Sequence, residues 1–259
     1  MAFKLDDIII DRIQYGYAED FDGNALYSLT QLADATISIT AESKDAVDAT
    51  GTLIKRFWQG KSGEFTANNA MINLNILGAA SGEGKVLASA EAPIEMPKII
   101  VVKAGATETL TGYNDGAISV NGLGTNGAMG KAYTKGEEAS AENFAIVDGV
   151  FMPPTDAEYV QFIVKYERNV ESGVAIANRA DKFPQTVKLT LKALCVDPCS
   201  ADTLRACYIV LPSFQVSPEV EINLTTDGQL AYSGSLQVDY CSADKALYYI
   251  YMAEEDEEE

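Results

Sequence analysis

The sequence predicts an all-β protein, a β-barrel or β-sandwich with one or two short helices. Apolar and polar residues alternate with a period of two through most of the 259 residues. Sustained helical periodicity is nearly absent, and Gly- and Asp-containing turns separate the alternating runs. Because 47% of the residues are hydrophobic, the chain can bury a core without disulfides.

The first clear strand is predicted at residues 34–40, Asp-Ala-Thr-Ile-Ser-Ile-Thr. A polar linker, residues 42–48, follows it and is longer than a tight hairpin needs. Residues 53–58 and 64–68 then form the two strands of a predicted hairpin, with Gly60-Lys-Ser-Gly63 as its turn.

Residues 69–80 carry apolar side chains three residues apart, a spacing that predicts one short amphipathic helix. An apolar strand is expected at 98–103. Residues 104–157 are rich in Gly, Ala, Thr, Asn and Glu, and this composition predicts a loop-rich insertion.

Strand alternation is clearest after residue 158. Apolar residues of 187–195 share one face, and 206–211 are apolar enough for a central strand. Asp227-Gly228 between alternating runs predicts a hairpin turn. The strands expected in this half are 160–167, 187–195, 206–211, 219–225, 234–240 and 246–251.

We expect residues 1–252 to form a single β-rich domain with the insertion at 104–157. The remaining residues, 253–259, form a run of six acids after one alanine. Because such a run has little to pack against, we expect it to be a disordered tail.

Acidic residues outnumber basic residues by 38 to 19, which gives a net charge of −19. DNA affinity comes largely from cationic side chains, so non-specific binding to DNA is disfavoured. Taken alone, the charge favours solubility and self-avoidance of the chain, and it also suggests a surface past which DNA could slide without binding. The chain contains no histidine, which excludes catalytic triads with an imidazole base. Carboxylate pairs remain possible in principle, but no pair stands out, and we expect neither enzymatic activity nor a cofactor.

The first ten residues lack the apolar core of a secretory signal. No stretch approaches the ~18 apolar residues of a membrane helix. We therefore expect a protein made in, and initially folding in, the cytoplasm, without a membrane partner.

Four cysteines occur, Cys195, Cys199, Cys207 and Cys241. The first two have the spacing of one zinc knuckle, whereas the last two do not form a second knuckle. We expect free thiols, with a zinc site as the less favoured alternative.

Two further motifs have competing interpretations. Gly122-Leu-Gly124-Thr-Asn-Gly127 matches the dinucleotide pattern G-x-G-x-x-G, but no alternating βαβ units surround it, and a flexible loop is expected.

Phe57 and Trp58 lie beside the predicted turn at 60–63. They form either a contact anchor or a pair that packs in and over the core.

The order of elements resembles the major tail tube protein of long-tailed bacteriophages. One segment carrying the likeness runs from Ala35 to Gly78: strand, polar linker, glycine, hairpin and short helix. The other runs from Pro184 to Tyr251, where an apolar strand ending Leu211-Pro212 precedes Glu219-Val-Glu-Ile, Asp227-Gly228 and two final strands. Together the two segments cover about half of the chain.

The resemblance implies a structural protomer that forms hexameric rings through its sheet edges, and the rings stack into a hollow tube for DNA delivery. Its partners would be other copies of the chain, a tape-measure protein, and tail terminator and tip proteins, all in the virion tail. DNA would pass through the tube without specific binding.

In the resembling family a loop equivalent to residues 41–63 reaches toward a neighbouring ring, so we expect this segment to contribute to contacts between subunits. Two other classes remain open. One is an adhesive, decoration or carbohydrate-binding β-sandwich of a virion, and the other is a hydrolase that uses paired carboxylates.

Overall fold

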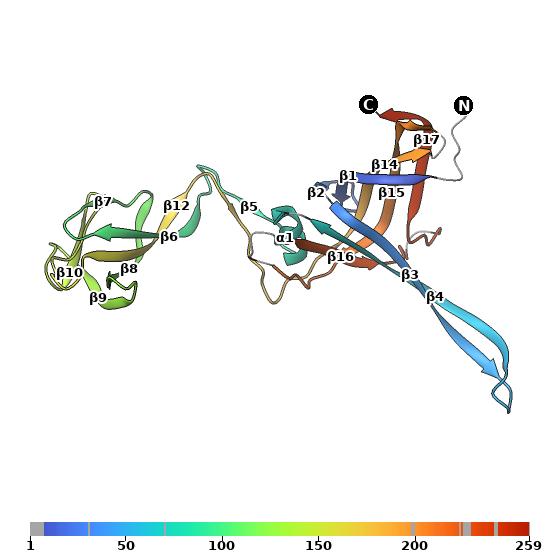
Figure 1. Cartoon of the computed structure of the whole chain (residues 1–259), viewed down its shortest axis with the longest axis horizontal. Helices are drawn as coiled ribbons and strands as arrows, with labels where there is room; N and C mark the ends of the chain where they lie inside the picture. The colour runs from blue at the N-terminus through green and yellow to red at the C-terminus, as the bar shows by residue number, and fades with distance from the viewer. Residues whose placement is uncertain are drawn as a thin grey trace. The chain divides into compact units, whose positions relative to one another are not determined.

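Figure 1 shows the computed structural model of the chain. The structure describes residues 8–30, 32–69, 71–197, 200–222, 224, 229–240 and 243–258. Strands dominate, which confirms the all-β class. The chain divides into two compact units: unit 1 is Met1–Lys85 with Ile176–Glu259, and unit 2 is Val86–Ala175. None of the described residues belongs to a helix with the length and apolarity that a membrane crossing requires.

Unit 1 is built on one antiparallel sheet that curves into a nearly closed, barrel-like form. The strand order is β2-β1-β14-β15-β16-β4-β3, and β17 also pairs with β15. The strands are β1 (Ile9–Glu19), β2 (Ala25–Thr30), β3 (Leu32–Val47), β4 (Leu53–Asn69), β14 (Thr186–Asp197), β15 (Ser200–Val216), β16 (Leu230–Leu236) and β17 (Tyr249–Glu258).

The core of unit 1 forms where alternate residues of β14 and β15 face the same side. The predicted apolar stripe of 187–195 is buried and pairs with the apolar residues 206–211 of β15. Phe65 packs against Phe214 and Tyr232 with ring centroids 5.9 and 6.1 Å apart, both in edge-on geometry. Aromatic pairs favour this arrangement, so three strands meet in one packed centre.

The predicted helix at 69–80 is confirmed as α1 (Leu74–Ser81). Asn73 caps its start, because the side-chain oxygen accepts hydrogen bonds from two backbone N–H groups of the first turn at 2.8 and 3.4 Å. Gly82 ends the helix with φ 76°, a conformation that glycine adopts at low cost. A Cβ at Gly82 would also overlap the backbone of Phe183.

The predicted hairpin turn at 60–63 is wrong. β4 continues through these residues, and the turn between β3 and β4 lies between Asp48 and Thr52. Gly63 serves close packing instead, since a Cβ there would lie 2.8 Å from apolar side-chain carbons of β3 and β16. The expected linker at 42–48 is accordingly strand up to residue 47.

The C-terminal elements differ from the expectation in several places, and one is the strand expected at 234–240, because β16 covers Leu230–Leu236 and residues 237–239 lie outside any strand. Residues 219–221 lie outside any strand, and Ile222 forms only an isolated bridge. The predicted turn Asp227-Gly228 lies outside the described residues. β17 extends to Glu258, so its backbone pairs with β15 inside the segment 253–259 that was expected to be disordered.

Unit 2 has its own sheet and core. The strand order is β6-β12-β8-β9-β10-β11-β7, with β9 and β10 parallel and the other pairs antiparallel. Its largest buried side chains are Phe144, Phe151, Phe162 and Tyr166. The strands are β6 (Ile94–Lys103), β7 (Glu108–Thr109), β8 (Tyr113–Leu123), β9 (Met129–Gly136), β10 (Asn143–Val147), β11 (Val150–Met152) and β12 (Gln161–Val170), and β5 (Val86–Leu87) pairs with β13 (Val174–Ala175) outside this sheet.

The stretch 104–157, expected to be loop-rich, carries strands β7 to β11. Its glycines mark short turns between these strands: Gly105, Gly112, Gly127 and Gly149 have φ between 73° and 79°. The formal dinucleotide motif lies at the β8–β9 turn and opens no helix. Glycine abundance here therefore reflects turns rather than missing structure.

Candidate assembly interface

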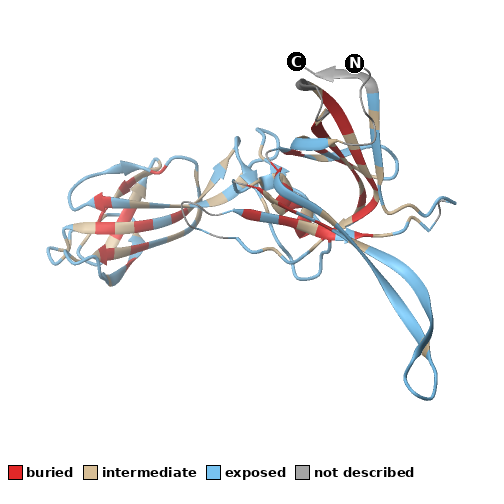
Figure 2. Cartoon of the chain, turned by 45° about the vertical axis from the view of Figure 1, so that its right-hand side comes forward, coloured by how far each residue is buried: buried red, intermediate tan, exposed pale blue. Residues whose placement is uncertain are grey.

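A two-stranded arm leaves the sheet of unit 1. Residues 63–69 of β4 pair with both β3 and β16, whereas residues 53–61 pair with β3 alone among the described residues. We call residues 41–61 the arm. Figures 1 and 2 show it projecting beyond the curved sheet, and every residue of the arm except Ala46 is exposed.

The side chain of Asp48 organises the tip of the arm. Its Oδ1 accepts hydrogen bonds from the backbone N–H groups of Thr50 and Thr52, both at 2.8 Å, and from the Thr50 hydroxyl at 2.7 Å. These bonds lower the pKa of the Asp48 carboxyl, with the Thr50 hydroxyl as the largest cause. Gly51 completes the turn at φ 85°, so the tip has a defined conformation.

A bidentate ion pair joins the two strands midway along the arm. Arg56 Nε and Nη2 donate to the two Asp45 carboxylate oxygens at 2.8 and 2.9 Å. The pair lowers the pKa of Asp45 and raises that of Arg56. The same guanidinium carbon lies 5.8 Å from the centre of the Trp58 ring, within cation–π range. These contacts hold the Trp58 side chain against its own strand.

The arm exposes apolar surface that nothing in unit 1 covers. Trp58 is 67% exposed and Phe57 55% exposed, so neither packs in the core. Of the two interpretations that the sequence left open for Phe57 and Trp58, packing in and over the core is therefore wrong, and both side chains are exposed. Three other large apolar residues of the arm are also exposed, although the sequence pattern did not single them out: Val47, Leu53 and Ile54.

Charge also distinguishes the arm from the rest of the chain. Its four basic residues and three acidic residues give a net charge of +1, whereas the whole chain carries −19, so the other residues together carry −20. Opposite potentials on two surfaces favour their encounter. A positively charged, apolar arm is therefore suited to an acidic protein surface.

The described cysteines do not point to a metal site. Cys195 and Cys207 lie buried on neighbouring strands, β14 and β15, and are free thiols. Burial raises the pKa of both thiols. Cys199 and Cys241 lie outside the residues whose placement is described. Within the described part of the chain, no group of Cys, Asp and Glu side chains has the arrangement of a metal site.

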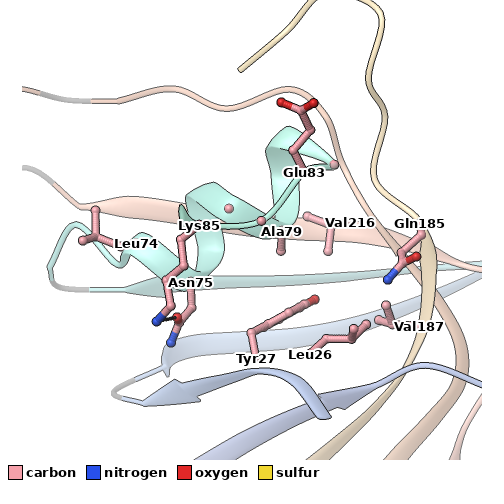
Figure 3. A pocket seen from close by; sticks show the side chains of 13 residues that line it. Leu26, Tyr27, Leu74, Asn75, Ala79, Glu83, Lys85, Gln185, Val187 and Val216 are labelled. Carbon is pink, nitrogen blue, oxygen red and sulfur yellow. Dashed lines mark hydrogen bonds between the residues drawn. The ribbon is translucent and has the colours of Figure 1, made fainter. Parts of the chain in front are cut away.

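A cavity of about 340 Å³ lies beside α1 (Figure 3). Its polar side chains are largely occupied with one another: Lys85 Nζ donates to Asn75 Oδ1 at 2.8 Å, and Asn75 Nδ2 donates to the Ser28 carbonyl at 2.9 Å. Tyr27, on the same wall, shares a hydrogen bond of 3.0 Å with Tyr232. This arrangement stabilises the fold around α1 and presents no catalytic group.

The fold defines an all-β protein with two compact β units, the first of which carries the projecting arm. The chain belongs to the YomU/Tube protein family, a phage-derived family that matches residues 9–252. A search of curated proteins found no match.

Proposed function

We propose that the chain is the self-assembling structural subunit of a phage tail tube, in which rings of the protein stack into a hollow conduit for DNA delivery. The exposed arm is the observation that carries the proposal. Membership of a family described as a tube family supports it, and also supports a non-enzymatic role in the virion.

The arm is suited to contacts along the tube. Isolated two-stranded hairpins are marginally stable in water, and five large apolar side chains exposed on one ribbon form an interaction surface. The acidic remainder of a second copy complements the positive charge of the arm. Docking on a neighbouring subunit buries the apolar side chains and lowers the repulsion between highly acidic copies.

Sheet edges are suited to contacts around a ring. β2 and β3 are the two ends of the main strand order in unit 1, and both carry backbone groups without a partner strand on one side in the described residues. Such edges pair with strands of other chains. A head-to-tail contact of this kind closes into a ring when its rotation allows closure. The high negative charge then lets DNA pass without binding, and tape-measure, terminator and tip proteins are the expected further partners.

Electron microscopy of an arm-shortened chain tests the proposal. Deleting residues 43–47 and 53–58 brings the Asp48–Thr52 turn to the base of the arm and leaves every core residue in place. We expect the wild-type chain to form stacked tubes and the shortened chain to stay folded but to form no stacked tubes, because the sheet edges assigned to the ring contacts remain while the arm is lost. Normal tubes from the shortened chain would contradict the role of the arm, and a wild-type chain that stays monomeric at high concentration would contradict the tube itself.

A second candidate function is glycan binding by a virion adhesion or decoration module. A groove of about 640 Å³ on unit 1 carries a row of hydroxyl side chains, with Phe183 exposed at its edge. Hydroxyl groups bind sugar hydroxyls and an aromatic ring stacks on a sugar face. A glycan array with wild-type and Phe183→Ala protein separates the two functions, because the tube proposal requires no glycan. The hydroxyl side chains of the groove are Ser38, Thr40, Ser62, Ser217, Ser233 and Ser235.

A further inference from the structure

Strand β6 forms one end of the sheet in unit 2. Its ten residues pair with β12 along one side, and no described residue pairs with the other side. A long, exposed and apolar strand edge is a template for pairing with another strand. β6 therefore offers an interaction surface independent of the arm.

The backbone groups that face the free edge follow from the register. Ala104 N–H donates to the Val160 carbonyl at 2.9 Å, one step beyond the pair Lys103 and Gln161. Backbone direction alternates along an antiparallel strand, so even-numbered residues of β6 face β12 and odd-numbered residues face the free edge. Pro97, which has no N–H to donate, lies at an odd position, where an edge strand tolerates it.

The side chains of the odd-numbered residues lie on the exposed face of the sheet. Ile99 is 62% exposed and Val101 is 53% exposed. The row begins with an acid, ends with a base and is apolar between them. In chain order, the five residues are Glu95, Pro97, Ile99, Val101 and Lys103.

We propose that β6 pairs antiparallel with β6 of a second copy of the chain, about a two-fold axis at Ile99. In this register Glu95 lies opposite Lys103, Pro97 opposite Val101, and Ile99 opposite itself. Each charge meets its opposite and each apolar residue meets an apolar residue. A register centred on residue 97 or 101 pairs neither charge with its opposite, so the sequence of the strand selects the register centred on 99.

The proposed β6 contact joins two chains and leaves no equivalent surface for a third. A two-fold contact uses the same surface on both partners and does not propagate, whereas rings and stacked tubes need head-to-tail contacts. Between the two β6 strands, the Ile99 pair can form both of its backbone hydrogen bonds. Each Pro97–Val101 pair can form only one, because Pro97 lacks an N–H. At the far end the Lys103 carbonyl already accepts from the Ala106 N–H at 3.1 Å. The dimer is therefore separate from the proposed tube and is expected to be reversible.

Cysteine crosslinking of the full chain tests the register. Ile99→Cys places two thiols directly opposite each other, within the Cα separation that a disulfide accepts. Val101→Cys is the matched control on the same face, since its two copies would lie roughly 13 Å apart, four residues along the ladder. We expect mild oxidation to give a covalent dimer on a non-reducing gel for Ile99→Cys alone, above the wild-type background from native cysteines. Equal crosslinking of both variants, or none for Ile99→Cys, overturns the proposal.

Charge reversal tests the pairing without new cysteines. Glu95→Lys or Lys103→Glu alone replaces two attractive pairs by two repulsive pairs, and we expect each to raise the dimer dissociation constant by roughly tenfold. The double variant restores the pairing and should return the constant to near the wild-type value. Sedimentation equilibrium below the concentration at which tubes form measures all four chains. A double variant as weak as the single variants refutes the two-fold register, whereas tube formation is unaffected by either result.

Discussion

Replacing Trp58 by serine tests the arm at its most exposed aromatic residue. A tryptophan buries on the order of 150–250 Å² at an interface, and two thirds of this side chain is exposed in the free subunit. Docking then removes roughly 100–170 Å² from water, worth about 2.5 to 4 kcal/mol at ~25 cal/mol per Å². Since each 1.4 kcal/mol is about a factor of ten, Trp58→Ser should raise the critical concentration for assembly roughly a hundredfold.

The assay is light scattering or sedimentation over a dilution series, with thermal unfolding of the unassembled subunit measured in parallel. Subunit stability should change by less than about 0.5 kcal/mol, because an exposed side chain away from the core contributes little to folding. Met129→Ser is the control, since Met129 is similarly exposed but lies in unit 2. An unchanged critical concentration for Trp58→Ser refutes the role of the arm, and a large loss of subunit stability shows that Trp58 packs on its own chain.

Three further predictions concern the subunit itself. Phe214→Ala should cost about 3–5 kcal/mol in urea unfolding, because the buried ring packs against both Phe65 and Tyr232 in the core. Burial raises the pKa of Tyr27 to about 12, above the value of about 10 in an unfolded chain. The stability that folding gains from the neutral Tyr27 hydroxyl is therefore complete below about pH 10 and is lost as pH rises toward 12. In Tyr27→Phe, the free energy of unfolding should fall less steeply over this pH range. Asp48→Ala should speed proteolytic cleavage at the tip of the arm while core stability stays constant, and equal cleavage rates would show that the turn does not depend on the carboxylate.

Much of unit 1 follows from the sequence because its strands bury one face. The stripe at 187–195 alternates with polar residues, and the period of two assigns the buried side directly. The tip of the arm was misplaced because Gly60-Lys-Ser-Gly63 has the composition of a turn. A better signal was present in Asp48-Ala-Thr-Gly51, where an aspartate that accepts backbone N–H groups precedes a glycine at positive φ.

Unit 2 was hidden for a different reason. Within 104–157, β7, β10 and β11 are short, and turns, most of them containing glycine, separate the five strands. Composition over a long window therefore averages strand and turn residues together. Burial of Phe144 and Phe151 depends on pairing between strands that composition does not report. For Phe57 and Trp58, alternation identified a strand but did not show that the strand leaves the sheet, which is a property of the pairing with β16.

The arm exposes an aromatic ring on each of its two faces, and this limits how it can bind under the proposed function. Successive side chains of a strand point to opposite faces, so Phe57 and Trp58 project on opposite sides of the ribbon, and both are exposed. Docking on one flat surface would cover one ring and leave the other in water. A groove formed between two neighbouring copies covers both, and it also surrounds the positively charged arm with acidic protein. An arm of this kind therefore binds a surface that exists only once other subunits have met, so ring formation would precede stacking.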